Sequence, residues 1–405
     1  MRSAPLSGIR VIDLSRAIAG PYGTLVLGDL GAEIIKIEPP EGDLSRFSTG
    51  PNHKGESYYY MAFNRNKKQM VLDLGTRSGK QAFEDLVRKS DVVWDNFRAG
   101  VDQRLGIDYE TLKKINQKII CCSITGYGSS GPDFEKPSYD VVVLAKAGML
   151  SITGEPDRPP VKPGTAIGDL AAGLFGVIGV LSALNRRNKT GEGSKVEVSM
   201  LDAVISLMGY PLSYYLCSGI VPKPLGSHHL GILPFGVYKA RNGYIAIGTS
   251  WPRIARAVDA EWMIEDPRFK TLEERLKHRE EFIAALEERL SHADVEDWMN
   301  IFEAEDIGAS PVNTIDKVVQ DPQVLHQKMI LSMEHSLGGE IRLAGNPVKI
   351  EGISEEAYIP PPTFGQHTRE ILLNIIGYSE KQISRLKQEE EEHAKERVVH
   401  VAKSL

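Results

Sequence analysis

An aspartate at the start of an apolar helix is the residue of this sequence best placed to do chemistry. Asp169 stands in the run GTAIGDLAAG at residues 164–173, where a turn passes into small and apolar residues. At a helix N-terminus a carboxylate meets unpaired backbone N–H groups and the positive end of the helix dipole, which hold it charged and aimed. Such a carboxylate can serve as a nucleophile or a base. The alternative is that Asp169 only caps the helix, a common use of aspartate.

Two arginines that follow a predicted strand indicate a site for an anionic ligand. Arg98 and Arg104 come after the strand that leads into Asp95. In a parallel sheet the loops at the carboxyl ends of the strands share one edge, so both arginines would lie at a ligand crevice that could hold a bulky phosphorylated molecule. Pairing with surface carboxylates is the alternative for Arg98, and it is favoured for Lys67 and Lys68.

A glycine-rich run after another strand resembles a dinucleotide fingerprint but has the wrong context. Residues 126–131 read GYGSSG, and Pro132 and Pro137 follow at once. A dinucleotide site must open a helix whose N-terminus holds the pyrophosphate, so the run predicts an irregular loop. The histidines lack metal-ligand spacing, since in the pair His228-His229 adjacent side chains point apart. We therefore expect no metal and no prosthetic group.

The composition narrows the class of partner and the compartment. The 405 residues carry a formal net charge of −6, which offers no basic field for nucleic acid. The three cysteines, Cys121, Cys122 and Cys217, fit neither a disulfide framework nor a metal cluster and favour a reducing cytoplasm. The N-terminus lacks the apolar stretch of a signal peptide, and the most apolar run, Leu170 to Leu184, is shorter than the roughly 20 residues that a membrane span requires. We therefore expect no membrane partner.

Strands and helices alternate through the first half of the chain and predict the elements that position these residues. The predicted elements occupy residues 10–14, 20–29, 33–38, 70–74, 79–89, 91–94, 118–125, 170–184, 195–199 and 201–216, with a further strand at 341–350. Alternation of this kind indicates an α/β fold with a mostly parallel sheet flanked by helices.

Changes of composition along the chain predict the domains. Residues 1–220 would form the N-terminal part of a large domain with the ligand site, and residues 221–235, rich in proline, glycine and histidine, a linker. Residues 236–310 would form a smaller α+β domain. Residues 311–405 would return to the large domain and end, from residue 380, in a charged exposed helix or a frayed tail.

Several motifs together resemble the class III CoA-transferase family. They follow one another in order to about residue 380, and their joint occurrence is specific. They are RVIDL at 10–14 with AGP at 19–21, LGAEIIKIE at 30–38, Gly42-Asp43, Asn64 with Lys67, Asn96-Phe97-Arg98, GYG at 126–128 with Gly131-Pro132, Gly168-Asp169, Gly308 with Pro311-Val312, Asp321-Pro322-Gln323, and Gly365-Gln366-His367-Thr368. Formyl-CoA:oxalate and carnitine CoA-transferases belong to this family, as do α-methylacyl-CoA racemases.

The resemblance implies a fold, an assembly and a set of site residues. The fold would be a Rossmann-like large domain built from both chain ends plus a smaller domain, in an interlocked homodimer. Asp169 matches the aspartate that attacks the acyl-CoA thioester. The predicted CoA-binding residues are Leu72, Asn96, Phe97, Arg98, Arg104, Lys136 and Tyr139, the last two lying where relatives line the pantetheine and thioester region.

The activity implied is transfer of CoA between an acyl-CoA donor and a small carboxylic acid, through mixed anhydrides and an aspartyl-CoA thioester. Coenzyme A is then a substrate. Formyl-CoA transferases carry a glycine-rich loop over the oxalyl site, of which this chain shows only LGILPFG at 230–236, and they place a glutamine where this chain has Ile18. These departures put oxalate in doubt and favour larger acids such as succinate or other dicarboxylates.

Two alternatives remain open at the level of sequence. A racemase of the same fold needs two proton carriers facing the α-carbon, and in those enzymes a histidine precedes the aspartate where this chain reads Tyr139-Asp140. Tyrosine, with an ordinary pKa near 10, is a poor base at neutral pH. The second alternative is a non-enzymatic module that binds CoA.

Overall fold

The computed structural model describes residues 4–47, 50–351 and 358–403. The chain forms two compact units. Unit 1 comprises residues 1–149, 163–216 and 327–405, and unit 2 comprises residues 150–162 and 217–326. The predicted domain bounds need correction: residues 150–162, 217–220 and 311–326, which the sequence pattern assigns to the large domain, belong to unit 2.

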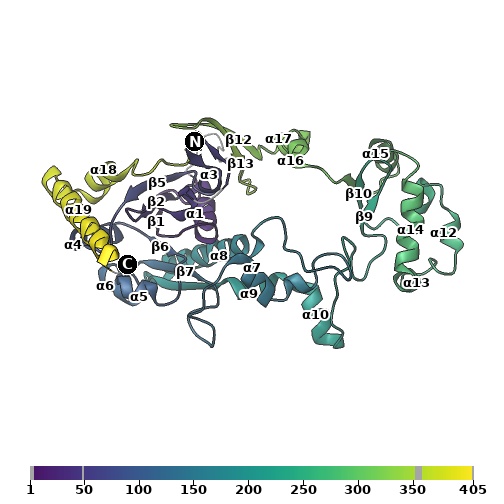
Figure 1. The fold of residues 1–405 in the computed structure, drawn as a ribbon, viewed down its shortest axis with the longest axis horizontal. Helices are drawn as coiled ribbons and strands as arrows, with labels where there is room; N and C mark the ends of the chain where they lie inside the picture. The colour runs from purple at the N-terminus through teal and green to yellow at the C-terminus, as the bar shows by residue number, and fades with distance from the viewer. Residues whose placement is uncertain (1–3, 48–49, 352–357, 404–405) are drawn as a thin grey trace. The chain divides into compact units, whose positions relative to one another are not determined.

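A parallel sheet of six strands forms the centre of unit 1 (Figure 1). Its strands are β1 (Arg10–Asp13), β2 (Glu33–Glu38), β5 (Lys67–Val71), β6 (Val92–Asp95), β7 (Ile120–Thr125) and β8 (Ser194–Ser199), in the spatial order β5-β2-β1-β6-β7-β8. Every neighbouring pair is parallel. The predicted α/β fold with a mostly parallel sheet is confirmed.

Helices lie between these strands and after the last of them. They are α1 (Ala19–Asp29), α2 (Leu44–Phe47), α3 (Tyr58–Met61), α4 (Arg77–Val87), α5 (Val101–Leu105), α6 (Tyr109–Ile115), α7 (Asp140–Lys146), α8 (Ile167–Thr190), α9 (Met200–Leu207) and α10 (Gly209–Ser218). Two small antiparallel pairs, β3 (Asn52–His53) with β4 (Glu56–Ser57) and β12 (Ile330–His335) with β13 (Gly339–Ala344), complete the strands of unit 1. As predicted, the glycine-rich run at 126–131 is an irregular loop.

The apolar helix α8 packs against α1 at very short range. A Cβ atom at Gly173 would lie 2.6 Å from the Ala19 carbonyl oxygen, so only glycine permits this approach. The helix has 24 residues, more than the run Leu170–Leu184 suggested, and within the described residues it is the one helix long and apolar enough to cross a membrane. Half of its most apolar window is buried inside the protein, as in the core helix of a globular fold.

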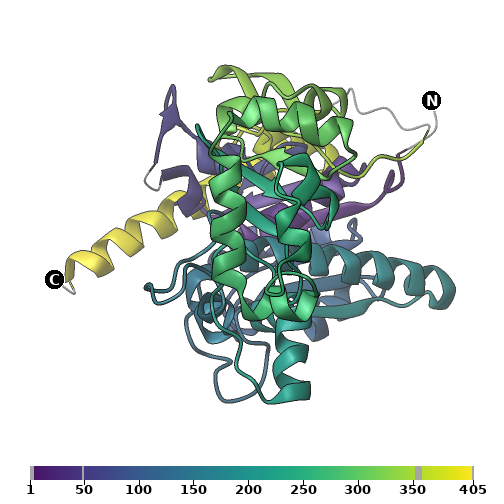
Figure 2. The ribbon, with the colours of Figure 1, turned by 90° about the vertical axis from the view of Figure 1, so that its right-hand side faces the viewer.

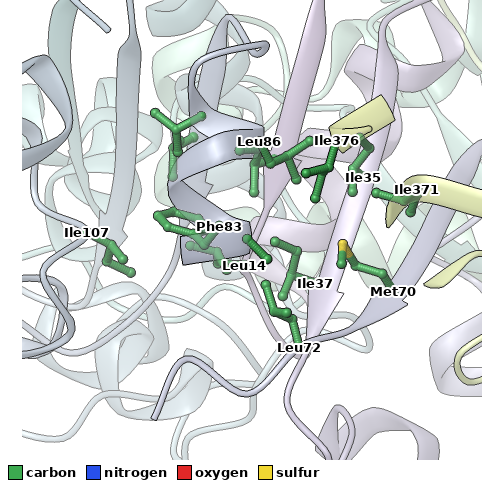
Figure 3. Packing of buried hydrophobic residues seen from close by; sticks show 14 of the residues in the cluster. Leu14, Ile35, Ile37, Met70, Leu72, Phe83, Leu86, Ile107, Ile371 and Ile376 are labelled. Carbon is green, nitrogen blue, oxygen red and sulfur yellow. The ribbon is translucent and has the colours of Figure 1, made fainter. Parts of the chain in front are cut away.

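A large apolar cluster of unit 1 lies on the other face of the sheet (Figure 3). Phe83 and Leu86 of α4 pack there against Ile35 and Met70 of the strands, and Ile371 and Ile376 come from the C-terminal part of the chain. Ile371 and Ile376 begin and end a π-helical turn that lies between α18 (Thr368–Glu370) and α19 (Glu380–Lys403). Figure 2 shows α19 as one continuous helix that ends at the C-terminus.

Four predicted elements need correction. The last helix is neither wholly exposed nor frayed, because Ile383 and Leu386 are buried in the core cluster. Strand β5 begins at Lys67 rather than Met70. A lysine can lie in this buried strand because its charge is paired with Asp13 inside the protein. The helix predicted over 201–216 is broken at Gly209, which adopts φ +49°. The strand predicted over 341–350 covers 339–344.

Unit 2 has its own core. Its three-stranded antiparallel sheet has the order β11-β10-β9, with β9 (Gly236–Lys239), β10 (Tyr244–Ile247) and β11 (Ala309–Pro311). Its helices are α11 (Arg253–Ala257), α12 (Trp262–Glu265), α13 (Leu272–Lys277), α14 (Arg279–Leu290), α15 (Val295–Ala304), α16 (Ile315–Val318) and α17 (Pro322–His326). Phe269, Phe282 and Phe302 are fully buried among them.

Candidate active site

The strand order of unit 1 creates a crevice at the carboxyl ends of β1 and β6. From β1 the chain builds the sheet outward through β2 and β5, and it then returns to the other side of β1 to add β6, β7 and β8. Ligands of open parallel sheets bind where the order reverses in this way, outside the carboxyl ends of the strands. The loops that leave β1 and β6, at residues 14–18 and 96–100, therefore border the candidate site.

Asn96 joins these two loops. Its Oδ1 accepts a hydrogen bond from the Arg16 N–H at 2.8 Å, and its Nδ2 donates to the Arg16 carbonyl oxygen at 2.8 Å. The Arg16 guanidinium lies 5.8 Å from the centre of the Phe97 ring. Both ends of the Asn96 amide are thus engaged with protein, and its direct contact with CoA stays a prediction. Sequence reasoning missed Arg16, whose exposed side chain lies at the crevice.

A small pocket opens beside the end of β6. Its lining includes Phe97 and Arg98 together with Phe134 and Lys195. Arg98 is exposed, as is Arg104 on α5, and neither forms an ion pair with any residue in the described ranges. Their charges are therefore available to an anion such as a phosphate group.

Lys67 and Lys68, unlike Arg98 and Arg104, form ion pairs within the protein. Lys67 Nζ lies 3.0 Å from Asp13 Oδ2, and Lys68 Nζ lies 2.8 Å from Glu370 Oε1. These ion pairs agree with the structural role favoured for both lysines from the sequence. They leave Arg98 and Arg104 as the cations better suited to a ligand.

Asp95, which sequence reasoning did not single out, fixes the loop after β6. Its carboxylate accepts hydrogen bonds from the Phe97 N–H at 3.1 Å and the Ser123 hydroxyl at 2.7 Å. Burial raises the pKa of Asp95 to about 6, although these two hydrogen bonds oppose the shift. The signal in the sequence was a carboxylate at the end of a buried strand, immediately before Asn-Phe-Arg.

The remaining predicted CoA contacts lie in three different settings. Leu72 is only 1% exposed and packs in the core cluster, so its side chain is not accessible to a ligand in this structure (Figure 3). Lys136 is exposed and pairs with Asp133 at 2.5 Å. Tyr139 is 67% exposed and precedes α7. The structure thus brings Phe97 and Arg98 together in one pocket and does not place Leu72 with them.

Asp169 is the third residue of α8 and does not cap it. The helix begins at Ile167, and its N-cap residue, Ala166, provides no side-chain hydrogen bond. The free N–H groups are instead bound by Asp140 from α7, whose Oδ1 accepts from Gly168 at 2.8 Å and from Asp169 at 3.3 Å. Because Asp140 caps the helix, the carboxylate of Asp169 is not needed for capping.

The carboxyl group of Asp169 has a raised pKa. Burial raises the pKa from 3.8 to about 7, and the nearby charge of Asp140 acts in the same direction. The sequence analysis expected the helix terminus to hold this group charged. That expectation is wrong at mildly acid pH, because burial and the charge of Asp140 both disfavour the ionised form of Asp169.

Tyr59 belongs to the same site and was missed by sequence reasoning. It lies on α3, and its pKa is raised to about 12 by burial and by the charges of Asp169, Asp43 and Asp140. The charges of the loop that contains Asp43, of the start of α8 and of the start of α7 therefore all act on one tyrosine hydroxyl. In the sequence Tyr59 was hidden in a run of three tyrosines.

The site offers acid–base and nucleophilic groups rather than a metal centre. Within the described residues, no cluster of three or more histidine, cysteine or acidic side chains is placed to hold a metal ion. The structure provides a partly buried carboxylate with a pKa of about 7, and exposed arginines that form no ion pair among the described residues at the crevice. Such an arrangement suits nucleophilic attack on an activated acyl group carried by an anionic ligand.

Comparison with known proteins agrees with this chemistry. The family model described as CoA-transferase family III matches residues 6–368. The chain is 34% identical to the succinyl-CoA:glutarate CoA-transferase of Homo sapiens, over 94% of this chain and 88% of that protein. It is 35% identical to the acetyl-CoA:oxalate CoA-transferase of Acetobacter aceti, over 87% of this chain and 90% of that protein.

A solved structure shows the same fold. The crystal structure of a CAIB/BAIF family protein from Brucella suis superposes with a TM-score of 0.83 at 32% sequence identity, covering 92% of this chain and 100% of that one.

Proposed function

Since the chain belongs to CoA-transferase family III and is an enzyme that transfers CoA from an acyl-CoA to a carboxylic acid, we propose that Asp169 is the nucleophile of this transfer. The crevice at the ends of β1 and β6 would hold CoA, with Arg98 and Arg104 on its phosphate groups. One observation carries the proposal: Asp169 is a partly buried carboxylate without a structural duty, because Asp140 caps its helix.

The first half-reaction moves CoA onto the enzyme. An oxygen of Asp169 attacks the carbonyl carbon of the donor thioester, the C–S bond breaks, and CoA leaves as a thiolate. The product is a mixed anhydride between Asp169 and the donor acid. The thiolate then attacks the carbonyl carbon of Asp169, the anhydride C–O bond breaks, and the donor acid leaves as a carboxylate. Asp169 now carries CoA as a thioester.

The second half-reaction is the reverse with a different acid. The acceptor carboxylate attacks the aspartyl thioester, which expels the CoA thiolate and forms a new mixed anhydride. The thiolate attacks the acyl carbon of the acceptor, and Asp169 is released as a carboxylate. A raised pKa suits this cycle, because a carboxylate that is more basic is also a stronger nucleophile.

We propose a short dicarboxylic acid as the acceptor. Relatives are named succinyl-CoA:glutarate and succinyl-CoA:mesaconate CoA-transferases, and a further one acetyl-CoA:oxalate CoA-transferase. The absence from the sequence of the long glycine-rich loop of formyl-CoA transferases supports an acid larger than oxalate.

We also propose a homodimer as the working assembly. Large apolar side chains on α8, α9 and α10 of unit 1 are exposed, among them Leu174, Ile178, Leu207, Tyr215 and Leu216. Large exposed apolar side chains on successive helices are typical of a surface that is covered by another subunit. The interlocked arrangement implied by the sequence resemblance would cover such a face.

The proposal is tested by trapping the intermediate. Wild-type enzyme is incubated with succinyl-CoA alone, digested, and its peptides are analysed by mass spectrometry with and without hydroxylamine. We expect CoA or a hydroxamate on the peptide that contains Asp169, and neither on the Asp169→Asn variant. Active wild-type enzyme without an adduct, together with an active Asn variant, would contradict the proposal.

A further inference from the structure

The turn between β1 and α1 is bound by side chains at every successive backbone polar group from the Ser15 N–H to the Ala17 N–H. In chain order, the Ser15 N–H donates to Asp13 Oδ1 at 2.9 Å, the Ser15 carbonyl accepts from Lys36 Nζ at 2.7 Å, the Arg16 N–H and carbonyl bind the Asn96 amide at 2.8 Å each, and the Ala17 N–H donates to Asp43 Oδ1 at 3.4 Å. Three residues are thus fixed from four separate places in the chain.

The backbone that these bonds fix is unfavourable on its own. Ala17 adopts φ +61°, in the left-handed region that residues with a Cβ rarely occupy. Such a conformation persists only where the surroundings determine it, and it is found most often at functional sites. The hydrogen bonds from Lys36 to the Ser15 carbonyl and from the Ala17 N–H to Asp43 hold Ala17 in this conformation.

The charges that hold the turn are themselves fully buried. Lys36 and Asp43 form an ion pair of 3.1 Å, with both side chains at 0% exposure. Lys67 and Asp13 form a second pair of 3.0 Å, equally buried. Buried ion pairs are poor sources of stability, because losing the hydration of both charges offsets their attraction, and apolar replacements are often no less stable. These two pairs are therefore better explained by a role in fixing the geometry of the turn than by a contribution to stability.

The turn lies at the junction of the two halves of the candidate site. On one side, Asn96 links it to the loop of Phe97 and Arg98. On the other side, the charge of Asp43 acts on the hydroxyl of Tyr59, as does that of Asp169. The turn also leads into α1, whose Ala19 carbonyl packs against Gly173, one helical turn beyond Asp169.

From this placement we infer that the Lys36–Asp43 pair is a positioning device for CoA transfer: by fixing the Ser15–Ala17 turn, it sets the distance between the bound thioester and Asp169. The inference rests on the proposed role of Asp169. Neither Lys36 nor Asp43 touches the reacting atoms. Displacing reacting groups by about 1 Å can cost on the order of 100-fold in rate, so a shift of this turn would reduce turnover more than binding.

The test removes both charges at once, so that no charge of the pair is left buried and unpaired. The double variant Lys36→Met/Asp43→Leu loses the bonds to Ser15 and Ala17. Its matched control is Arg65→Met/Asp29→Leu, which removes another buried ion pair, at 4% and 2% exposure, from the opposite end of α1. For both variants and wild type, kcat and KM for succinyl-CoA with glutarate are measured well below the Tm.

We expect the double variant at Lys36 and Asp43 to lose on the order of 100-fold in kcat with little change in KM for succinyl-CoA. The control should lose a similar amount of thermal stability and keep kcat near the wild-type value. Asp43→Asn breaks the ion pair but keeps an oxygen that can accept from the Ala17 N–H, so it should lose less kcat than the double variant, again with little change in KM. If the double variant does not fold, the kcat and KM of Asp43→Asn are compared with those of wild type to test the inference.

Three results would overturn the inference: equal kcat values for the double variant and its control, a change confined to KM, or an Asp43→Asn enzyme with the kcat of wild type. Asp169→Asn is measured in the same assay to separate the two proposals. If Asp169→Asn remains active, the proposed nucleophile is wrong. If it is inactive while the double variant turns over normally, only the positioning role is wrong.

Discussion

Asp140 caps the helix that carries Asp169 and at the same time raises the pKa of Asp169. One carboxylate oxygen of Asp140 accepts the N–H groups of both Gly168 and Asp169, at 2.8 and 3.3 Å. The negative charge that suits the helix terminus also disfavours a second negative charge close by. The same residue thus holds the proposed nucleophile in place and, together with burial, sets the pH at which it becomes active.

The pH dependence of turnover should report this relationship. Only ionised Asp169 is nucleophilic, so kcat/KM should rise with pH and level off above about 7, the pKa that burial and Asp140 give to Asp169. Asp140→Asn keeps an oxygen for the helix N–H groups and removes the charge. The acidic limb of the kcat/KM profile of Asp140→Asn should therefore move to lower pH, with a small change in Tm. Asp140→Ala should show the same shift and should also lose about 1 kcal/mol of stability, because it removes the helix cap. An acidic limb at the same pH in wild type and Asp140→Asn would contradict this interpretation.

Replacing Asp169 should stabilise the protein at neutral pH. The pKa of Asp169 is raised from 3.8 to about 7 by folding, so the folded state binds more protons than the unfolded state between these values. The stability that this group contributes is complete below its unfolded pKa and is lost as pH rises through 7. Asp169→Asn should therefore be more stable than wild type above pH 7, by up to about 4 kcal/mol, because each tenfold change in proton affinity corresponds to about 1.36 kcal/mol. The difference should shrink toward pH 4.

Thermal unfolding of both proteins across this pH range checks the prediction. An N-cap role for Asp169 predicts the opposite result for Asp169→Ala, a loss of about 1 kcal/mol that includes neutral pH. A stability difference that does not vary with pH would show that Asp169 titrates near its ordinary pKa.

Arg104→Ala should weaken binding of the acyl-CoA more than it slows turnover. Arg104 is exposed and has no ion pair among the described residues, so its charge is available to a phosphate group far from the thioester. A contact of this kind contributes equally to the ground state and the transition state. Loss of one charged hydrogen bond should raise KM for succinyl-CoA roughly tenfold with kcat nearly unchanged. Arg88→Ala, which removes an exposed arginine that pairs with Asp85, is the control and should leave both constants unchanged.

The enzyme should be a dimer that exchanges subunits very slowly. Leu174, Ile178 and Leu216 are exposed on the helices of unit 1 and need a covering surface. If the subunits interlock, they must partly unfold to separate. Sedimentation should give a dimer at micromolar concentration, and mixing tagged with untagged dimers should yield no mixed species within hours. A monomer, or fast exchange, would argue against interlocking.

The sequence alone determined the type of fold and the place of the principal carboxylate. The strands at Arg10–Asp13 and Glu33–Glu38 were predicted almost to the residue, because continuous β-branched apolar runs are a local signal of a buried parallel strand. Asp169 at the start of an apolar helix and Arg98 after a strand were also local signals. Such features can be recognised in the sequence because they depend on neighbours along the chain.

The tertiary structure decided what those residues do. That Asp140 caps the helix of Asp169, that Asn96 binds the Arg16 backbone, and that Leu72 is enclosed in the core all depend on partners far away in sequence or on packing from several elements. Lys36 lies inside β2 and Lys67 begins β5. A lysine in a strand is expected to be exposed, yet both are buried because folding brings Asp43 and Asp13 to them. Burial and distant charge also set the pKa of Asp169, and neither quantity exists before the chain has folded.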